Sequence, residues 1–104
     1  MSIDTQVQGN AGCIAMAGRF DLQVHRQFRE AYTQLLDNVA VHQIELELSR
    51  VTYLDSSALG MLMLLNERAH AAKKSVTLLN ASGVVLQVLE VANFGKIFTI
   101  RNAN

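Results

Sequence analysis

The sequence contains no proline, and it has a single cysteine among its 104 residues. One cysteine cannot form an internal disulfide or assemble a thiolate zinc site, so neither device stabilises this small chain. Cys13 lies in a short apolar stretch. We expect it to be a buried strand residue rather than a reactive thiol.

The sequence also lacks an excess of either charge, because nine basic residues balance nine acidic ones. Without a basic surplus to neutralise phosphates, we expect no nucleic-acid binding, and the overall charge gives no reason to expect binding to an anionic membrane. The longest apolar run, residues 58–65, is interrupted by Gly60 and is too short to span a membrane. The first residues do not resemble a signal peptide, so we expect a cytoplasmic protein.

What is present is typical of a folded domain: 50% of the residues are hydrophobic and 17% are charged. A chain of this length has room for one hydrophobic core and not for two. We therefore expect a single domain that spans residues 1–104.

Hydrophobic periodicity predicts eight elements along the chain. Alternating residues at 3–7 and 13–17, joined by a glycine-rich turn, indicate a β-hairpin. Asp21 is the predicted N-cap of a helix whose apolar residues recur from 24 to 39. Further on, the patterns predict a strand, a helix, a strand, a helix and a short last strand at 43–48, 57–72, 75–79, 83–92 and 97–100.

The predicted order is therefore β-β-α-β-α-β-α-β, which is typical of a layered α/β fold. We expect one mixed, mostly parallel sheet of about five strands, with the helices packed mainly on one face. The strands at 43–48 and 75–79 should be parallel, joined by a right-handed crossover through the second helix. Functional sites in such sheets gather where strands end and helices begin, and this points to residues 54–57.

Two adjacent serines follow an aspartate at this helix start: Asp55, Ser56 and Ser57. One interpretation is helix capping, which stabilises a helix by roughly 1 kcal/mol. Phosphorylation of a serine is a second interpretation, and the two do not exclude each other.

The helix that follows has no polar residue for two turns. Only one face of a helix can pack against the sheet, so some of these apolar residues must point away from it. We expect Leu59, Leu62, Met63 and Leu65 to face the sheet, and Met61 and Leu64 to point elsewhere. Met61 and Leu64 are then either covered by the third helix or part of an exposed patch that binds a partner. The small residues Ala58 and Gly60 leave room for that partner to approach.

The segment Asp55-Ser56-Ser57-Ala58-Leu59-Gly60 resembles the Asp-Ser-Ser/Thr-Gly/Ala-Leu-Gly signature of STAS domains, in particular the bacterial anti-sigma factor antagonists. Residues 18–21 and 93–98 are similar to two further elements of that family, in the same order. One departure is Ser82-Gly83, where many relatives have Ser-Pro before the third helix.

The resemblance implies that the serine after the aspartate, here Ser56, is phosphorylated, with Ser57 as the second candidate. It implies that Asp21 lies close to this phosphosite, and that the unphosphorylated chain binds an anti-sigma factor and so frees a sigma factor. Phosphorylation would release that partner. The implied partners are an anti-sigma factor or serine kinase of the histidine-kinase-like ATPase type and a phosphatase of the PP2C type.

Two other functions are weighed against this one. An enzyme would need a histidine base near Ser56, and the predicted elements place His25, His42 and His70 elsewhere, so we expect a kinase substrate without cofactor rather than an enzyme. A STAS accessory subunit that binds the ATPase of an ABC-type lipid transport system, without phosphorylation, is the stronger alternative. We expect a monomer, because the binding face must stay free.

Overall fold

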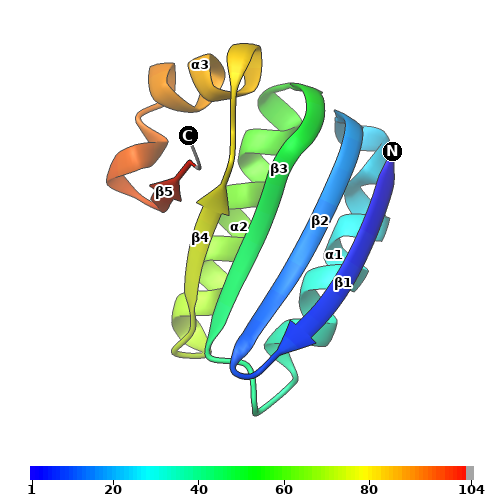
Figure 1. The fold of residues 1–104 in the computed structure, drawn as a ribbon, viewed down its shortest axis with the longest axis vertical. Helices are drawn as coiled ribbons and strands as arrows, with labels where there is room; N and C mark the ends of the chain where they lie inside the picture. Colours follow the sequence, from blue (N-terminus) through cyan, green and yellow to red (C-terminus); the bar gives the residue numbers. More distant parts are fainter. Residues whose placement is uncertain (103–104) are drawn as a thin grey trace.

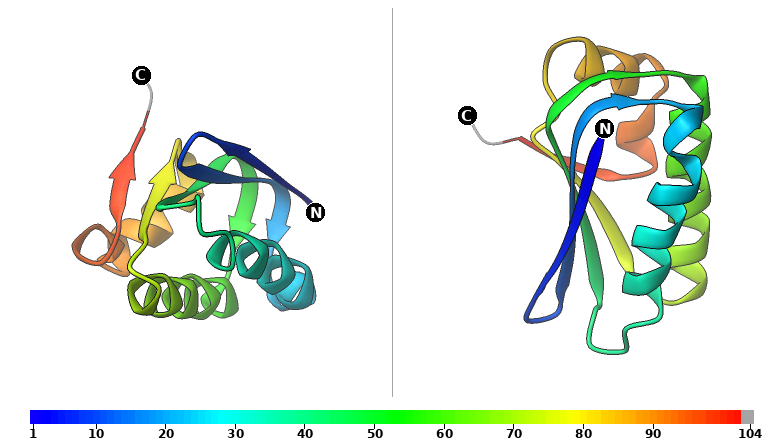
Figure 2. Two further views of the ribbon diagram at one scale, coloured as in Figure 1. Left: turned by 90° about the horizontal axis from the view of Figure 1, so that it is seen from below. Right: turned by 90° about the vertical axis from the view of Figure 1, so that its right-hand side faces the viewer.

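The computed structural model describes residues 1–102, which form a five-stranded sheet and three α-helices (Figure 1). The helices α1 and α2 lie side by side against one face of the sheet, while the other face is open (Figure 2). The elements in chain order are β1 (Ser2–Gln8), β2 (Ala11–Phe20), the 3₁₀ turn η1 (Leu22–Val24), α1 (His25–Leu36), β3 (Gln43–Leu54), α2 (Ser56–Ala71), β4 (Ser75–Leu79), α3 (Gly83–Val91), the 3₁₀ turn η2 (Phe94–Lys96) and β5 (Thr99–Arg101).

The strands follow one another across the sheet in the order in which they occur along the chain, β1-β2-β3-β4-β5. β1 runs antiparallel to β2, and every later pair is parallel. Parallel strands are joined almost always by right-handed crossovers, and successive crossovers in one direction place their helices on one face. The predicted α/β fold, with its mostly parallel sheet, is thereby confirmed.

The hydrophobic core lies between the sheet and the helices. The buried side chains of β3, Ile44, Leu46 and Leu48, alternate with its half-buried glutamates, as the sequence pattern predicts. From β2 and α1 come three aromatic rings, with Phe28 standing 5.0 Å from Phe20 and 5.3 Å from Tyr32 between ring centroids.

β3 is longer than its alternating pattern indicates and continues to Leu54. Beyond residue 48 only Val51 and Leu54 are buried, so the spacing changes from two to three residues and no longer reads as a strand. The register between β2 and β3 shifts twice in this region, and Gly18 takes a φ of 101°. The two strands bend together and carry their ends to the start of α2.

The first helix is shorter than predicted, because α1 ends at Leu36 and Val39 is 90% exposed. The side chain of Asn38 accepts a hydrogen bond from the N–H of Ala40 at 2.9 Å, which turns the chain out of the helix. Lys74 holds the following loop: its Nζ donates to the carbonyls of Asn38 and Val41 at 2.8 and 2.6 Å.

The last predicted strand also begins later, at Thr99, since residues 94–96 form η2. Within residues 1–102, no helix combines the length and the apolar character needed to cross a membrane.

Candidate partner-docking site at the start of α2

Ser56 is the first residue of α2 and is exposed. It stands just beyond the C-terminal end of β3, where sites of parallel sheets are expected. Ser57 is half-buried. Of the two adjacent serines, Ser56 is therefore the more accessible to another protein.

Asp55 caps the helix, so capping does not need either serine. Its Oδ1 accepts a hydrogen bond from the N–H of Ala58 at 2.9 Å, and its backbone is extended as an N-cap requires. The capping interpretation of this segment is thus correct for Asp55, and Ser56 is left exposed.

The end of β2 lies beside this helix start. The N–H of Asp55 donates to the carbonyl of Phe20 at 3.4 Å, and Asp21 is the next residue of that chain segment. The predicted closeness of Asp21 to the start of α2 follows from this pairing of strand ends. The Asp21 side chain accepts from the N–H of Gln23, and so caps η1 rather than α1 itself.

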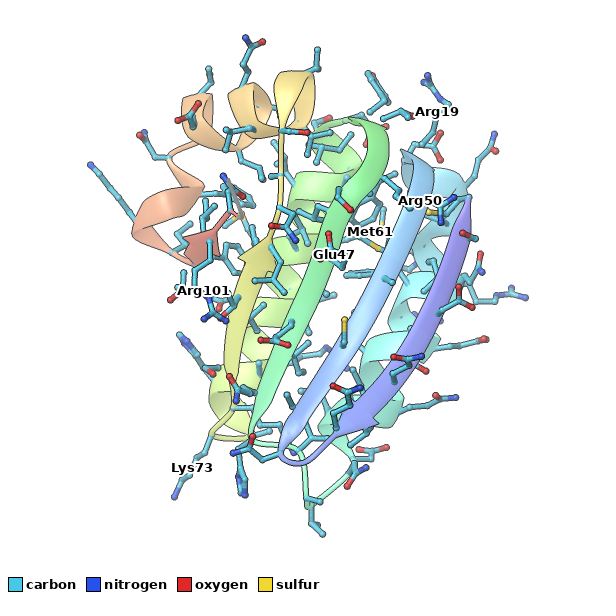
Figure 3. All side chains as sticks on the ribbon, in the orientation of Figure 1. Arg19, Glu47, Arg50, Met61, Lys73 and Arg101 are labelled. Carbon is cyan, nitrogen blue, oxygen red and sulfur yellow. The ribbon has the colours of Figure 1, made fainter. Side chains whose placement is uncertain are left out.

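Sequence reasoning did not identify Arg19 as a neighbour of the site. The parallel register places Arg19 opposite Tyr53, and its guanidinium lies 4.2 Å from the centre of the Tyr53 ring. Its Nε is 3.8 Å from a carboxylate oxygen of Asp21. The positive charge of Arg19 therefore lies at the same edge of the sheet as Asp21 and Asp55, and Figure 3 shows Arg19 at the end of β2.

The predicted orientation of α2 was wrong for its two methionines, although Leu62 is buried as expected. Met61 is only 6% exposed and Ala58 is fully buried, whereas Met63 is 51% exposed. Figure 3 places Met61 within the body of the molecule. The helix turns Ala58, Leu62, Leu65 and Ala69 onto the core at helical spacing, and α1 packs beside it, which widens the buried face.

An exposed stripe runs along α2 from Ser56 itself. Gly60, Met63 and Glu67 follow it at intervals of four, three and four residues, and all are exposed. The polar residues Glu67 and His70 mark the solvent-facing side of α2. Helical spacing from Glu67 back through Met63 and Gly60 could have predicted that Ser56 lies on the same side.

Two shallow grooves flank this stripe and extend it toward α3 and η2. One, of about 470 Å³, separates α2 from η2, and Ile97 and the half-buried Leu64 contribute to its walls. The other, of about 390 Å³, lies between α2 and α3. We define the docking surface as Ser56 together with the apolar and small residues of both grooves: Leu59, Gly60, Met63, Leu64, Val88, Val91, Ala92 and Ile97.

Gly60 contributes open space to this surface. A Cβ built at position 60 would have no heavy atom within 4 Å outside its own helical neighbourhood. Gly60 is therefore not required for close packing against the sheet.

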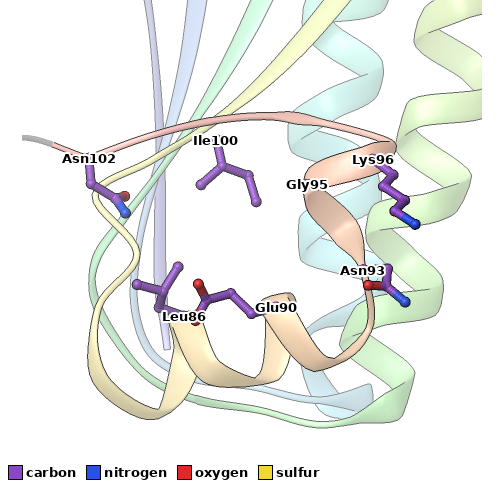
Figure 4. Close-up of a pocket in the computed structure, with 7 residues that line it drawn as sticks. All are labelled: Leu86, Glu90, Asn93, Gly95, Lys96, Ile100 and Asn102. Carbon is purple, nitrogen blue, oxygen red and sulfur yellow. The ribbon is translucent and has the colours of Figure 1, made fainter.

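A separate hollow of about 350 Å³ lies between α3, η2 and β5 (Figure 4). Glu90 and Lys96 give it one charge of each sign, and Ile100 forms an apolar wall. Neither Ser56 nor Asp55 lines it, so it does not belong to the docking surface.

The histidines do not gather at Ser56. His42 precedes β3 and His70 lies in the last turn of α2, both at the opposite end of the sheet. His25 begins α1, and no hydrogen bond between it and Ser56 occurs in residues 1–102. In the same residues, no three His, Cys, Asp or Glu side chains are grouped to hold a metal ion.

Cys13 lies on the open face of the sheet and is half-buried. Burial raises the pKa of its thiol, and the carboxylates of Glu45 and Glu47 on the neighbouring strand raise it further. A raised pKa keeps the thiol protonated and unreactive near neutral pH.

Residues 3–100 match the family model described as "Mlab, STAS domain". The chain belongs to the STAS domain family. This STAS domain is 39% identical, over 84% of each chain, to a STAS-domain containing protein of Pseudomonas aeruginosa (strain UCBPP-PA14).

The STAS domain is also similar in structure to the anti-sigma factor antagonist SpoIIAA from Bacillus. The unphosphorylated form of SpoIIAA superimposes with a TM-score of 0.78 at 22% identity, over 99% of this chain and 90% of SpoIIAA. The phosphorylated form gives a TM-score of 0.76 at 21% identity, over 99% and 92%.

An anti-sigma factor antagonist from Mycobacterium paratuberculosis matches with a TM-score of 0.84 at 13% identity, over 96% of this chain and 84% of that one. At these identities the structural comparisons establish the fold.

Proposed function

We propose that this STAS domain is an anti-sigma factor antagonist that works by partner switching. Unphosphorylated, it binds an anti-sigma factor or serine kinase of the histidine-kinase-like ATPase type and frees a sigma factor. Phosphorylation of Ser56 releases that partner, and a PP2C-type phosphatase restores binding. The chain is then a kinase substrate in the cytoplasm, not an enzyme. The supporting observation is that Ser56 is exposed at one end of the docking surface, on which Met63, Val91 and Ile97 are exposed apolar residues.

The physical basis is the desolvation of a charge. A phosphate adds about −1.5 to −2 charges at neutral pH. Placed one helical turn from Leu59 and Gly60, it would have to lose its water when a partner covers the docking surface, and this is costly unless the partner supplies a positive charge. Each ~1.4 kcal/mol of that cost weakens binding tenfold.

The domain itself should tolerate the phosphate. The first turn of α2 offers backbone N–H groups and the positive end of the helix dipole, and Arg19 supplies a cation at the same edge. Asp21 and Asp55 oppose it, but the ion pair between Arg19 and Asp21 offsets part of that repulsion. The effect of phosphorylation therefore falls on the interface more than on folding.

The test compares three forms of the chain as baits in the native cell: wild type, Ser56→Ala and Ser56→Asp. We expect Ser56→Ala to retain an anti-sigma factor or serine kinase, and Ser56→Asp to lose it. Fragment-ion mass spectrometry of the wild-type chain should place the phosphate on Ser56 rather than Ser57. An aspartate variant that binds its partner as tightly as wild type would refute the charge mechanism.

A matched pair of variants tests the docking surface. Met63→Glu introduces a charge at an exposed position of the stripe and should reduce partner retention at least tenfold, since that charge must be desolvated. Val39→Glu introduces the same charge at a more exposed valine in the loop after α1 and should leave retention unchanged. If an ABC-type ATPase is retained instead, whatever residue stands at position 56, the accessory-subunit alternative is correct.

A further inference from the structure

The outer edge of β1 has no partner strand in residues 1–102. β1 lies at one end of the sheet, with β2 on its paired side (Figure 1). A sheet edge exposes a row of N–H and C=O groups, and proteins commonly protect it with lysine, proline, a bulge or a very short strand. β1 uses none of these: its seven residues pair with β2 in continuous register and include neither lysine nor proline.

The side chains of β1 divide into an apolar and a polar row. Ile3 lies opposite the buried Met16, so Ile3, Thr5 and Val7 point to the helix-covered face. Ser2, Asp4, Gln6 and Gln8 point to the open face. Val7 is 46% exposed, and Ile3 is only partly buried against the core. An added strand would cover both.

The turn determines which backbone groups are free. Gln8 and Ala11 flank a turn of two residues, in which Gly9 has a φ of 59°. The hydrogen bond of such a turn joins its flanking residues, and the direction of backbone groups alternates along a strand. The backbone N–H and C=O groups of residues at even positions therefore point toward β2. Those of residues 3, 5 and 7 point outward from the free edge of the sheet.

We infer that two copies of this chain pair antiparallel through β1, with Thr5 on the twofold axis. In this register all seven residues of the strand pair, because Ser2 stands opposite Gln8 of the second copy. Ile3 then meets Val7 of the second copy, so apolar faces apolar. Asp4, which is the strand's one charged residue, meets Gln6 of the second copy and faces no like charge.

Neighbouring registers are worse. A pairing centred on Asp4 places two aspartates directly opposite each other, which is unfavourable. A pairing centred on Gln6 leaves Ser2 and Ile3 outside the paired segment and puts Val7 opposite Thr5. The strand is thus complementary to itself in one register, and this favours a second copy over an unrelated strand as its partner.

The dimer leaves the docking surface free. The edge of β1 is separated from β3, which leads to Ser56, by the whole of β2, and α3 and η2 lie at the other side of the sheet (Figure 1). The expectation of a monomer assumed that self-association would cover the binding face, and pairing through β1 does not do so. This inference is independent of the proposed function.

Sedimentation equilibrium over a range of concentrations tests the inference. The wild-type chain should show a monomer–dimer equilibrium. Gln6→Lys places a cation opposite Asp4 of the second copy and should tighten the dimer about tenfold, while Gln6→Asp creates facing aspartates and should weaken it about tenfold, because each dimer contains two such pairs.

Position 6 is exposed, so both variants should fold, as far-UV circular dichroism would verify. Gln87→Lys and Gln87→Asp make the same charge changes at an exposed position of α3 and should leave the dimer unchanged. A chain that remains monomeric up to millimolar concentration overturns the inference. So does a dimer to which the lysine and aspartate variants at position 6 give equal affinity.

Discussion

The carboxylate of Asp55 accepts a hydrogen bond from the N–H of Ala58 across 2.9 Å. This contact starts α2 at Ser56 and assigns the capping role to the aspartate. The neighbouring Ser56 side chain is consequently exposed at the first position of the helix rather than needed to hold it together.

Replacing Asp55 and Ser56 one at a time distinguishes their contributions to stability. Asp55→Ala should lower the free energy of unfolding by about 1 kcal/mol, because an N–H of the first turn loses its partner. Ser56→Ala should change the free energy of unfolding by less than about 0.5 kcal/mol, as is usual for an exposed position. Urea denaturation measures both. Equal losses from the two variants would show that the serine shares the capping role.

Gly60→Ala should stabilise the isolated chain. Glycine within a helix costs up to about 1 kcal/mol relative to alanine, and an added Cβ at this position meets no neighbouring atom within 4 Å. The urea midpoint should therefore rise. If the partner needs the space above Gly60, the same variant weakens partner retention; a fall in stability would mean that position 60 packs more closely than the structure shows.

Lys74 should contribute strongly to stability, although lysine is usually a surface residue. Its ammonium is nearly buried and donates to the carbonyls of Asn38 and Val41. Lys74→Met leaves both carbonyls without this partner and should cost about 2–3 kcal/mol in the free energy of unfolding. The adjacent Lys73 projects into solvent (Figure 3), so Lys73→Met should be nearly neutral in the same urea titration.

The Cys13 thiol should react slowly with iodoacetamide in the folded chain. Burial, followed by Glu45 and Glu47, raises its pKa, so the midpoint of the alkylation rate against pH should lie above the usual thiol value. Glu45→Gln removes one nearby negative charge and should lower that midpoint. A midpoint that does not move would exclude Glu45 as a cause and leave burial and Glu47.

The raised pKa of the Cys13 thiol also makes the stability of the fold depend on pH. Because folding raises this pKa, the folded chain holds the thiol proton more tightly than the unfolded chain does. The thiol's contribution is therefore fully present below its ordinary pKa and is lost as the pH rises through the folded value. Cys13→Ala should remove this part of the alkaline destabilisation, as thermal unfolding at several alkaline pH values would measure.

The sheet was predictable because its strands carry local signals. The alternation of Ile44, Leu46 and Leu48 with two glutamates marks one buried face, and the turn at Gly9 joins a hairpin whose pairing is close in sequence. The β-α-β order then implies the parallel pairs and the side on which the helices lie.

The orientation of α2 was not predictable in the same way, because nearly every residue from Ala58 to Leu65 is apolar. Within that run periodicity does not separate Met61 from Met63, and the polar residues that distinguish the two faces, Glu67 and His70, lie beyond it. Their difference in exposure depends on α1, which packs beside α2 and covers one flank. Arg19 was missed for a related reason: its approach to Tyr53 depends on a bent register between two strands far apart in sequence.

Each strand of this sheet after β1 pairs with the strand made just before it. During synthesis on the ribosome, every new strand therefore meets an edge that already exists, and none must be inserted between two strands that have paired earlier. The sheet can be extended in the direction of translation, with β1 and β2 as its first ribbon. Synonymous changes that slow translation after Phe20 should accordingly leave the yield of folded protein unaffected.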